Sequence, residues 1–326
     1  MPDVTNFMNF GKSLNPSDKQ EAFLISELKQ INEVCREDKL LSSLVSPDLN
    51  VSIQVIHDDK RQAPIYDDMS KSVVYHQQIV DNQMNNKGKD GINYYTQSSL
   101  FHELVHAEQM QSGLKPAQMK MAGNRPCFVI ENAYDLMGIE AECKMLNAMY
   151  HIKAWQKEGK SLDDIKQHCI TQQKEGKEFE HGNVIPEYID AMKQSQQQGK
   201  SENGAHLAAG KQVILSLMSG KYPEWKNMYL KQINTLIENQ TKQHFPKPEQ
   251  QSSLKLRVRL LRNYGITKDD LENCQMTQQL RESRPGYGHY AELTGIKHQQ
   301  SSSLQGRTLA DIQRLNALKN RITQGM

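Results

Sequence analysis

The sequence lacks the marks of membrane, secreted and nucleic-acid-binding chains. No window approaches 18 consecutive apolar residues, so we expect no membrane-spanning helix. The chain does not open on a basic segment followed by an apolar core, so we expect no use of the general secretory route. Lys and Arg number 40 against 38 Asp and Glu, a formal charge of +2. Nucleic acid or an anionic membrane is therefore not expected as a partner.

The sequence has few cysteines, and they are widely separated along the chain. The five cysteines are Cys35, Cys127, Cys143, Cys169 and Cys274. No two of them form a Cys-x-x-Cys pair, which argues against a disulfide framework or a structural zinc ribbon and favours reduced thiols in a cytosol. Apolar residues make up only 37% of the chain, so we expect a thin core under long polar surfaces.

The chemistry predicted from the sequence rests on the segment LFHELVHAE at residues 100–108. On a helix, His102 and His106 project from the same face about one turn apart. Two such imidazoles can bind one Zn²⁺, and Glu103 beside the metal can act as a general base. The apolar residues of the segment predict a buried helix, which would fix the ligands in a low dielectric.

The alternative is an ordinary core helix with two hydrogen-bonded histidines and a solvent-facing Glu. The chain has only 11 histidines in 326 residues, so chance seldom places two of them at this spacing around a Glu. Two buried imidazoles would each also need a polar partner. We therefore favour the metal site.

A protease zinc site needs a third protein ligand and keeps water in the fourth position. Ser112, six residues after the second histidine, cannot supply that ligand, so we expect it on a later helix. Glu131 is the preferred candidate, and Glu140 and Glu142 are its rivals on the same predicted helix. Asp135, one turn after Glu131, is expected to accept the outer ring N–H of a ligand histidine. For each of these acids the alternative is a solvated helical side chain.

The developing negative charge on the substrate needs a further donor. Tyr287 or Tyr290, in a loop with Pro285, Gly286 and Gly288, is a candidate for that donor. His289 is an equal candidate, and surface-loop aromatics are the alternative explanation.

Around the motif, the sequence predicts a helix from Asp18 to about Leu44 and a half-buried strand at 51–55. A second strand, Lys71–Val80, is our candidate for a sheet edge that holds an extended substrate by backbone hydrogen bonds. An internal strand fits its sequence equally well.

After the motif helix, Gly113 is a plausible stop signal, and Pro126 is expected to open a helix running to about Trp155. The basic and apolar segment 254–262 predicts a packed element with a solvated face rather than an RNA- or lipid-binding patch.

A resemblance follows from these residues. The segments Leu100–Ala107, Val129–Tyr134 and Gly138-Ile139 resemble the secreted-effector zinc protease family typified by NleD, over about residues 70–142. That family has a leucine-rich His-Glu-x-x-His-Ala helix and a later Glu-Asn segment followed by Gly and an aliphatic residue. The resemblance implies a bacterial effector that is delivered into a host cell and cleaves a host protein there.

We therefore expect an α+β fold: a zincin-like core with a small sheet, plus a mostly helical C-terminal region. The expected divisions are a mobile arm at 1–20, a catalytic core at 21–158 and a helical, substrate-selecting region at 159–326. The expected activity is zinc-dependent endopeptidase cleavage by a monomer, with the chain in the bacterial cytoplasm before specialised export and acting in the host cytosol.

Two alternatives stay open at this point. One is a non-catalytic host-protein-binding effector with a structural zinc, marked by a fourth protein ligand in place of water. The other is a zinc hydrolase that acts on a bond other than a peptide.

Overall fold

The computed structural model describes residues 18–46, 48–56, 63–86, 94–114, 117–122, 125–130, 133–176, 182–231 and 251–274. The chain forms two compact units, residues 1–280 and 281–326, and every described residue belongs to the first. Of residues 117–122, 125–130 and 133–135, the structure describes the backbone only. Residues 1–17 of the arm expected at 1–20 lie outside the described residues, and residues 18–20 belong to α1.

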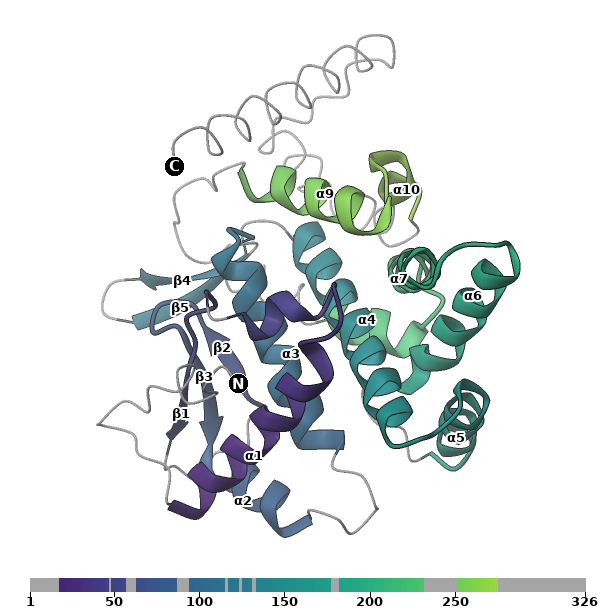
Figure 1. The fold of residues 1–326 in the computed structure, drawn as a ribbon. Coiled ribbons are helices and arrows are strands. Elements are labelled where there is room, and N and C mark those ends of the chain that lie inside the picture. Colours follow the sequence, from purple (N-terminus) through teal and green to yellow (C-terminus); the bar gives the residue numbers. More distant parts are fainter. Residues whose placement is uncertain are drawn as a thin grey trace, which may run out of the picture. The chain divides into compact units, whose positions relative to one another are not determined.

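The fold is α+β, mostly helical, with a small three-stranded sheet (Figure 1). The helices are α1 (Asp18–Cys35), α2 (Gln77–Asn86), α3 (Tyr94–Gln111), α4 (Ala133–Lys157), α5 (Leu162–Lys174), α6 (Ile185–Gln197), α7 (Glu202–Met218), α9 (Gln251–Tyr264) and α10 (Lys268–Glu272), with 3-10 turns at Ser42–Val45 and Gly182–Val184. Residues 223–231 are also helical. The strands are β1 (Ser52–Ile56), β2 (Ile65–Asp67), β3 (Ser72–His76), β4 (Ala117–Ala122) and β5 (Arg125–Ile130).

The first helix follows its apolar periodicity. Every apolar residue at the predicted helical spacing is buried: Phe23, Leu24, Leu28, Ile31 and Val34. The helix ends at Cys35 rather than near Leu44, and Asp38 accepts the backbone N–H groups of Leu40 and Leu41 in the turn that follows. A side chain that bonds nearby backbone groups in this way competes with helix continuation.

The sheet corrects one prediction. Its strand order is β1-β3-β2, with β1 parallel and β2 antiparallel to β3. The expected edge strand is therefore the central one, and the chain turns into α2 at Gln77 instead of continuing as a strand to Val80. Ser72, Val73, Tyr75 and His76 are all buried, as a central position requires. The antiparallel edge is β2.

The helix expected from Pro126 is also wrong over its first five residues. Residues 125–130 form β5, which pairs antiparallel with β4, and α4 begins only at Ala133. The run Phe128-Val129-Ile130 explains this, because aromatic and β-branched residues favour strands. Pro126 takes the second position of the strand, opposite Met121.

The 25-residue helix α4 forms the centre of the described unit. It contacts α1, α3, α5, α6, α7 and α9, and residues 141–152 are buried without interruption. Figure 1 shows α4 between α3 and the α6–α7 pair. A helix that is buried all round must match its polar side chains to specific partners.

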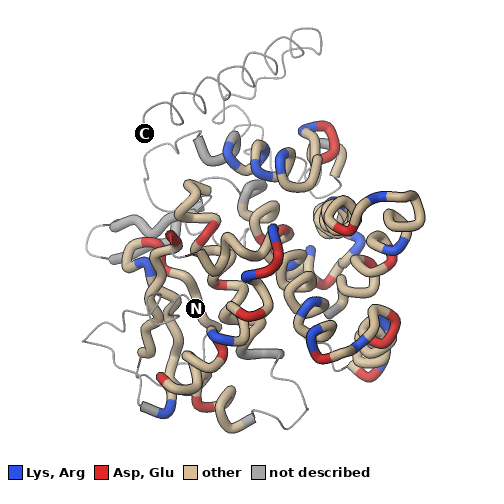
Figure 2. Tube along the Cα trace, viewed as in Figure 1, with Lys and Arg blue, Asp and Glu red and all other residues tan. Residues whose placement is uncertain are grey.

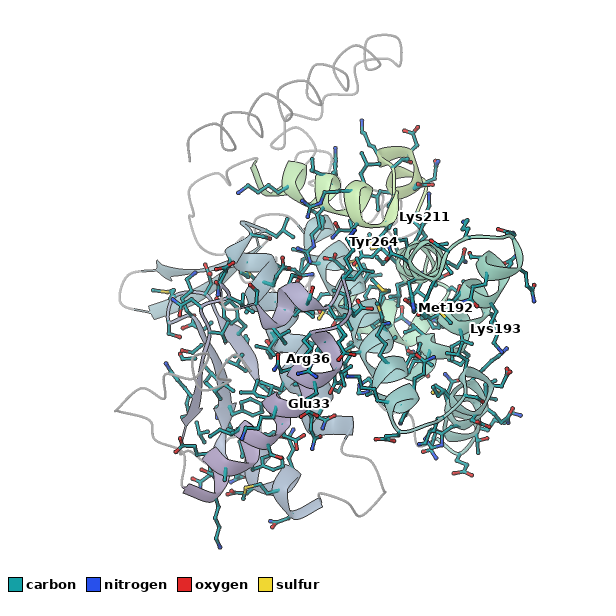
Figure 3. The ribbon with its side chains drawn as sticks, in the orientation of Figure 1. Glu33, Arg36, Met192, Lys193, Lys211 and Tyr264 are labelled. Atoms are coloured by element: carbon teal, nitrogen blue, oxygen red, sulfur yellow. The ribbon has the colours of Figure 1, made fainter. Side chains whose placement is uncertain are left out.

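The last described helices attach to α4 and α7 by charged and small residues. Lys211 of α7 binds Gly265 O at 3.0 Å and Asp270 Oδ2 at 2.9 Å, and Figure 3 shows it near Tyr264. Figure 2 shows basic residues along α9 and acidic ones on α10. The predicted packed element at 254–262 is confirmed by the burial of Leu256 and Leu260.

No helix in the described ranges is long and apolar enough to cross a membrane. Four cysteines in the same ranges are buried free thiols: Cys35, Cys143, Cys169 and Cys274.

Candidate metal centre

The motif lies on α3, whose end is set by Gly113. This glycine has φ +91°, a left-handed conformation that favours glycine, as expected for the stop. Its N–H bonds Met110 O at 3.0 Å, and Leu114 N–H bonds Gln109 O at 2.9 Å, which together form a Schellman motif. Phe101 stacks on Tyr150 of α4 with ring centroids 4.6 Å apart. The helix α3 therefore ends at a defined residue and packs against α4 in a defined orientation.

The two histidines of the motif face one another. The Nε2 atoms of His102 and His106 are 3.0 Å apart, and the two rings meet edge to face. Their side chains are only 14% and 12% exposed. The spacing of four residues therefore places both imidazoles on one helix face, as predicted.

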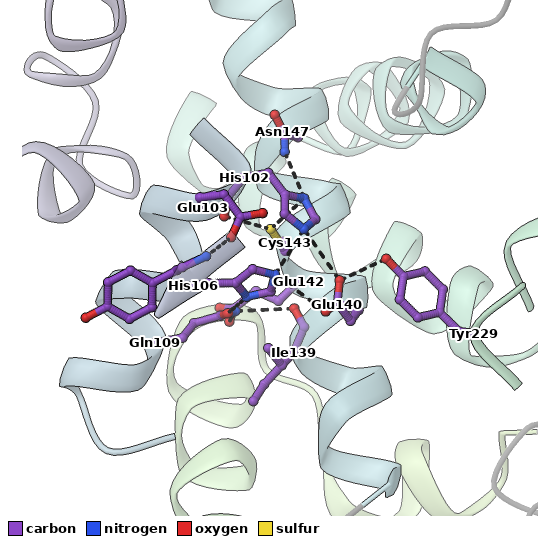
Figure 4. A network of polar contacts seen from close by, with 11 residues as sticks. His102, Glu103, His106, Gln109, Ile139, Glu140, Glu142, Cys143, Asn147 and Tyr229 are labelled. Atoms are coloured by element: carbon purple, nitrogen blue, oxygen red, sulfur yellow. Dashed lines mark hydrogen bonds and ion pairs between the residues drawn. The ribbon is translucent and has the colours of Figure 1, made fainter. Parts of the chain in front are cut away.

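A carboxylate from α4 faces both rings. Glu140 Oε2 lies 3.6 Å from His102 Nε2, and Glu140 Oε1 lies 3.4 Å from His106 Nε2 (Figure 4). The hydroxyl of Tyr229, in the helical segment 223–231, donates to Glu140 Oε2 at 2.9 Å. Glu140 thus presents one carboxylate oxygen to the Nε2 atom of each histidine, between α3 and α4.

Cys143 reaches the pair from the other side of His102. Its Sγ lies 3.1 Å from His102 Nδ1, and Asn147 Nδ2 lies 3.5 Å from the same nitrogen. His102, His106 and Cys143 bring one donor atom each within 4.8 Å of one another, and this group could hold a metal ion. Cys143 follows Glu140 by three residues, so both side chains lie on one face of α4.

The donor distances fit a small divalent ion. Donor atoms around a tetrahedral zinc with bonds of about 2.0–2.1 Å lie about 3.3 Å apart. The two Nε2 atoms and the Glu140 oxygens, 3.0 to 3.6 Å apart, match this spacing. The Cys143 contact, in contrast, is to the outer nitrogen of His102, where a ligand histidine usually has a hydrogen-bonding partner.

The electrostatics distinguish the two imidazoles. Burial lowers the pKa of His102 well below its ordinary value, and the neighbouring His106 and Lys144 lower it further. For His106, burial also lowers the pKa, but the carboxylates of Glu140 and Glu103 outweigh it, and the pKa is raised. Negative charge therefore gathers on the His106 side of the pair, where a cation would be stabilised.

Glu103 is buried beside the sheet edge. It is 7% exposed, and its Oε2 accepts the backbone N–H of Tyr66 in β2 at 2.6 Å. Its carboxylate raises the pKa of His106, so its charge acts on the histidine pair.

The other predicted site residues fall where less is described. Glu131, Tyr287, His289 and Tyr290 lie outside the described residues. Asp135 lies in the first turn of α4, and only its backbone is described.

Several polar partners were not predicted. Gln109 lies one turn after His106, a spacing that could have indicated it. Tyr229 and Arg259 come from segments more than 80 residues away along the chain, and nothing in their local sequence marks them.

Comparisons with protein-family models, with curated proteins and with solved structures find no match to this chain.

Proposed function

We propose that this protein is a zinc-dependent endopeptidase in which His102, His106 and Glu140 hold the metal. The observation that carries the proposal is the Glu140 carboxylate, with one oxygen near each Nε2 atom. Three protein ligands leave a fourth position for water, the arrangement typical of catalytic rather than structural zinc. This choice takes the rival Glu140 in place of Glu131 as third ligand.

When bound, zinc would lower the pKa of a coordinated water and polarise the scissile carbonyl. The remaining roles belong to the chain. Glu103 accepts the proton of the attacking water and delivers it to the leaving amine. The Tyr66 N–H donates to one oxygen of Glu103 and so fixes the orientation of the carboxylate. Burial of the site excludes bulk water and strengthens these interactions.

A peptide is the substrate class that the sheet favours. β2 is a three-residue strand at the sheet edge, and its Tyr66 N–H already bonds the Glu103 carboxylate. An extended peptide that adds to this edge would lie next to the proposed base. Ile65 and Met69, 56% and 76% exposed, offer apolar contacts beside this edge.

The proposed setting follows from the resemblance to the NleD-typified effector proteases. It is a bacterial effector that cleaves a host protein in the host cytosol after export by a specialised machine. The buried, unpaired thiols among the described residues are compatible with a reducing compartment.

Cys143 supports a second candidate function. If its sulfur served as a fourth ligand in place of water, the site would be closed and the zinc structural, as in a non-catalytic binding protein. The observation on which this alternative depends is that His102, His106 and Cys143 each bring a donor atom within 4.8 Å of the other two. Cys143→Ser separates the two: an open site keeps one zinc per chain and its activity, whereas a closed site loses zinc affinity.

The decisive experiment measures zinc content and new protein N-termini together. The parental chain, Glu103→Gln and the surface control Glu37→Gln are each incubated with host lysate. We expect about one zinc per chain in all three, and cleavage that o-phenanthroline abolishes in the parent and in Glu37→Gln only. Equal cleavage by Glu103→Gln would show that Glu103 is not the base.

A further inference from the structure

A chain of buried polar contacts links α9 to the metal-binding histidines. His106 Nδ1 lies 3.0 Å from Gln109 Oε1, and Gln109 Nε2 donates to Glu142 Oε2 at 2.9 Å. Glu142, with a fully buried side chain, also accepts Arg259 Nε at 2.7 and 2.8 Å. Figure 4 shows the inner part of this chain, from His106 through Gln109 to Glu142.

We propose that Glu142 and Arg259 are positioning residues that determine which ring nitrogen of His106 carries its proton, and so present the other nitrogen to the metal. This inference rests on the proposed metal centre but not on hydrolysis. It concerns how tightly and in which tautomer His106 binds, and it assigns a role to α9.

The donor and acceptor groups of these residues fix the direction of each hydrogen bond from Glu142 to His106. An ionised carboxylate accepts hydrogen bonds and cannot donate them, so Glu142 must face the NH₂ group of Gln109. The same NH₂ group also faces Ile139 O at 3.3 Å. The carbonyl oxygen of Gln109 is thereby turned toward His106. An oxygen at that position requires N–H on Nδ1, which leaves the lone pair of Nε2 directed at Glu140 and the metal.

Arg259 is the ion-pair partner of Glu142. The guanidinium bonds both oxygens of Glu142, and its other arm pairs with Glu108 on α3 at 2.7 Å. Tyr264 OH donates to Glu142 Oε1 at 3.0 Å. A fully buried carboxylate without such partners would be strongly destabilised in its charged form.

Two glycines allow α9 to pack closely against α4 and α7. A Cβ on Gly138 would meet Leu256 Cδ2 at 2.9 Å, and one on Gly210 would meet Tyr264 Cδ1 at 3.0 Å. Helices approach this closely only where one side carries no side chain. Two glycines, on α4 and α7, thus let α9 bring Arg259 within reach of Glu142.

The test compares zinc affinity and imidazole tautomer in full-length variants. Zinc Kd is measured by competition with a chelating dye, and long-range ¹H–¹⁵N spectra of ¹⁵N-histidine protein report the tautomer of each ring. We expect Glu142→Gln to weaken zinc binding about tenfold, because loss of such a supporting partner costs about 10–100-fold. Its amide can offer NH₂ to Gln109, so the fraction of His106 protonated on Nδ1 should fall.

Two further variants complete the experiment. Gln109→Met, of similar size, removes the acceptor itself and should weaken zinc binding at least about tenfold even if Glu142→Gln does not fold. Arg257→Gln, on α9 like Arg259, is the control and should keep the parental Kd. Parental zinc affinity and tautomer in either folded variant would overturn the inference. Zinc binding without any cleavage would instead contradict the hydrolase proposal alone.

Discussion

The contact between α3 and α4 and the contact between α6 and α7 are both buried, but they bury different chemistry. Between α3 and α4, the buried set includes Glu103, Gln109, Glu142 and Asn147. Between α6 and α7, it is mostly apolar: Ile185, Tyr188, Ile189, Met192, Ala205, Ala209, Val213, Ile214, Leu217 and Met218. The hydrogen bonds that cross the second contact are Tyr188 OH with His206 Nδ1 at 2.8 Å, and those that Ser216 Oγ and Gln212 Nε2 donate to Glu187 Oε1 at 2.6 and 3.1 Å.

This difference separates function from stability. Burying polar and charged groups costs free energy unless every group finds a partner, and an apolar filling of the same volume is often at least as stable. The polar residues between α3 and α4 converge on one pair of histidines, whereas the apolar residues between α6 and α7 converge on nothing but each other. Mutations in the two contacts should therefore change different measured quantities.

The largest expected effect is on the metal. We expect His102→Ala to weaken zinc binding more than about a hundredfold, because even the loss of a supporting partner costs about 10–100-fold. Elemental analysis after gel filtration and dye competition measure this. His168→Ala, a partly exposed histidine on α5, is the control and should bind zinc as the parent does. Stoichiometric zinc in His102→Ala would remove His102 from the ligand set.

The apolar contact should show the opposite pattern. Leu217→Ala removes a fully buried side chain and should lower the free energy of unfolding by about 2–5 kcal/mol without changing zinc Kd in the folded protein. Urea unfolding and dye competition measure the two quantities. Leu215→Ala, a half-buried leucine two residues earlier, should cost much less. A changed zinc Kd in Leu217→Ala would show that the two contacts are not independent.

A third prediction concerns pH and the buried His151 of α4. Burial lowers its pKa from 6.5 to about 3. His151 therefore binds a proton below about pH 6.5 in the unfolded chain but only below about pH 3 in the native chain. The native state loses stability as pH falls through this window. His151→Phe should reduce the loss between pH 7 and 5 by about 2 kcal/mol.

Urea unfolding of metal-free protein at several pH values measures that slope. His168→Phe is the control, since the pKa of His168 is also lowered but its ring is more exposed. An unchanged slope in His151→Phe would mean that other groups cause the acid sensitivity.

The smallest effect tests two tyrosines that both donate to carboxylates. Tyr229→Phe loses the hydrogen bond to Glu140 and should weaken zinc binding by about 1 kcal/mol, or about fivefold. Tyr222→Phe loses a hydrogen bond to Glu187 in α6 and should leave zinc Kd unchanged. If both changes altered zinc Kd equally, the hydrogen bond from Tyr229 to Glu140 would have no specific effect on the metal site.

Apolar spacing and turn residues in the sequence correctly predicted several helices, one strand and one helix end. The buried positions of α1, the alternating burial of β1, the end of α3 at Gly113 and the packed face of α9 all follow from spacing and turn chemistry. The helix expected from Pro126 is wrong at 126–130: Pro126 suits a helix start, but the strand-forming residues after it and the partner strand β4 favour a hairpin. For segment 71–80 the sequence fits an edge strand and an internal strand equally well, because it does not reveal which strand is central; the internal position is the observed one.

By itself, the sequence determined that two imidazoles and a carboxylate share one buried helix, because helical geometry relates residues four apart wherever the helix lies. Only the tertiary structure decided what meets them. Glu140 and Cys143 face the histidines because α4 packs on α3, and Arg259 reaches Glu142 because glycines on α4 and α7 admit α9. Contacts between residues 30 to 120 positions apart depend on how helices pack, and a single sequence carries no local record of that packing.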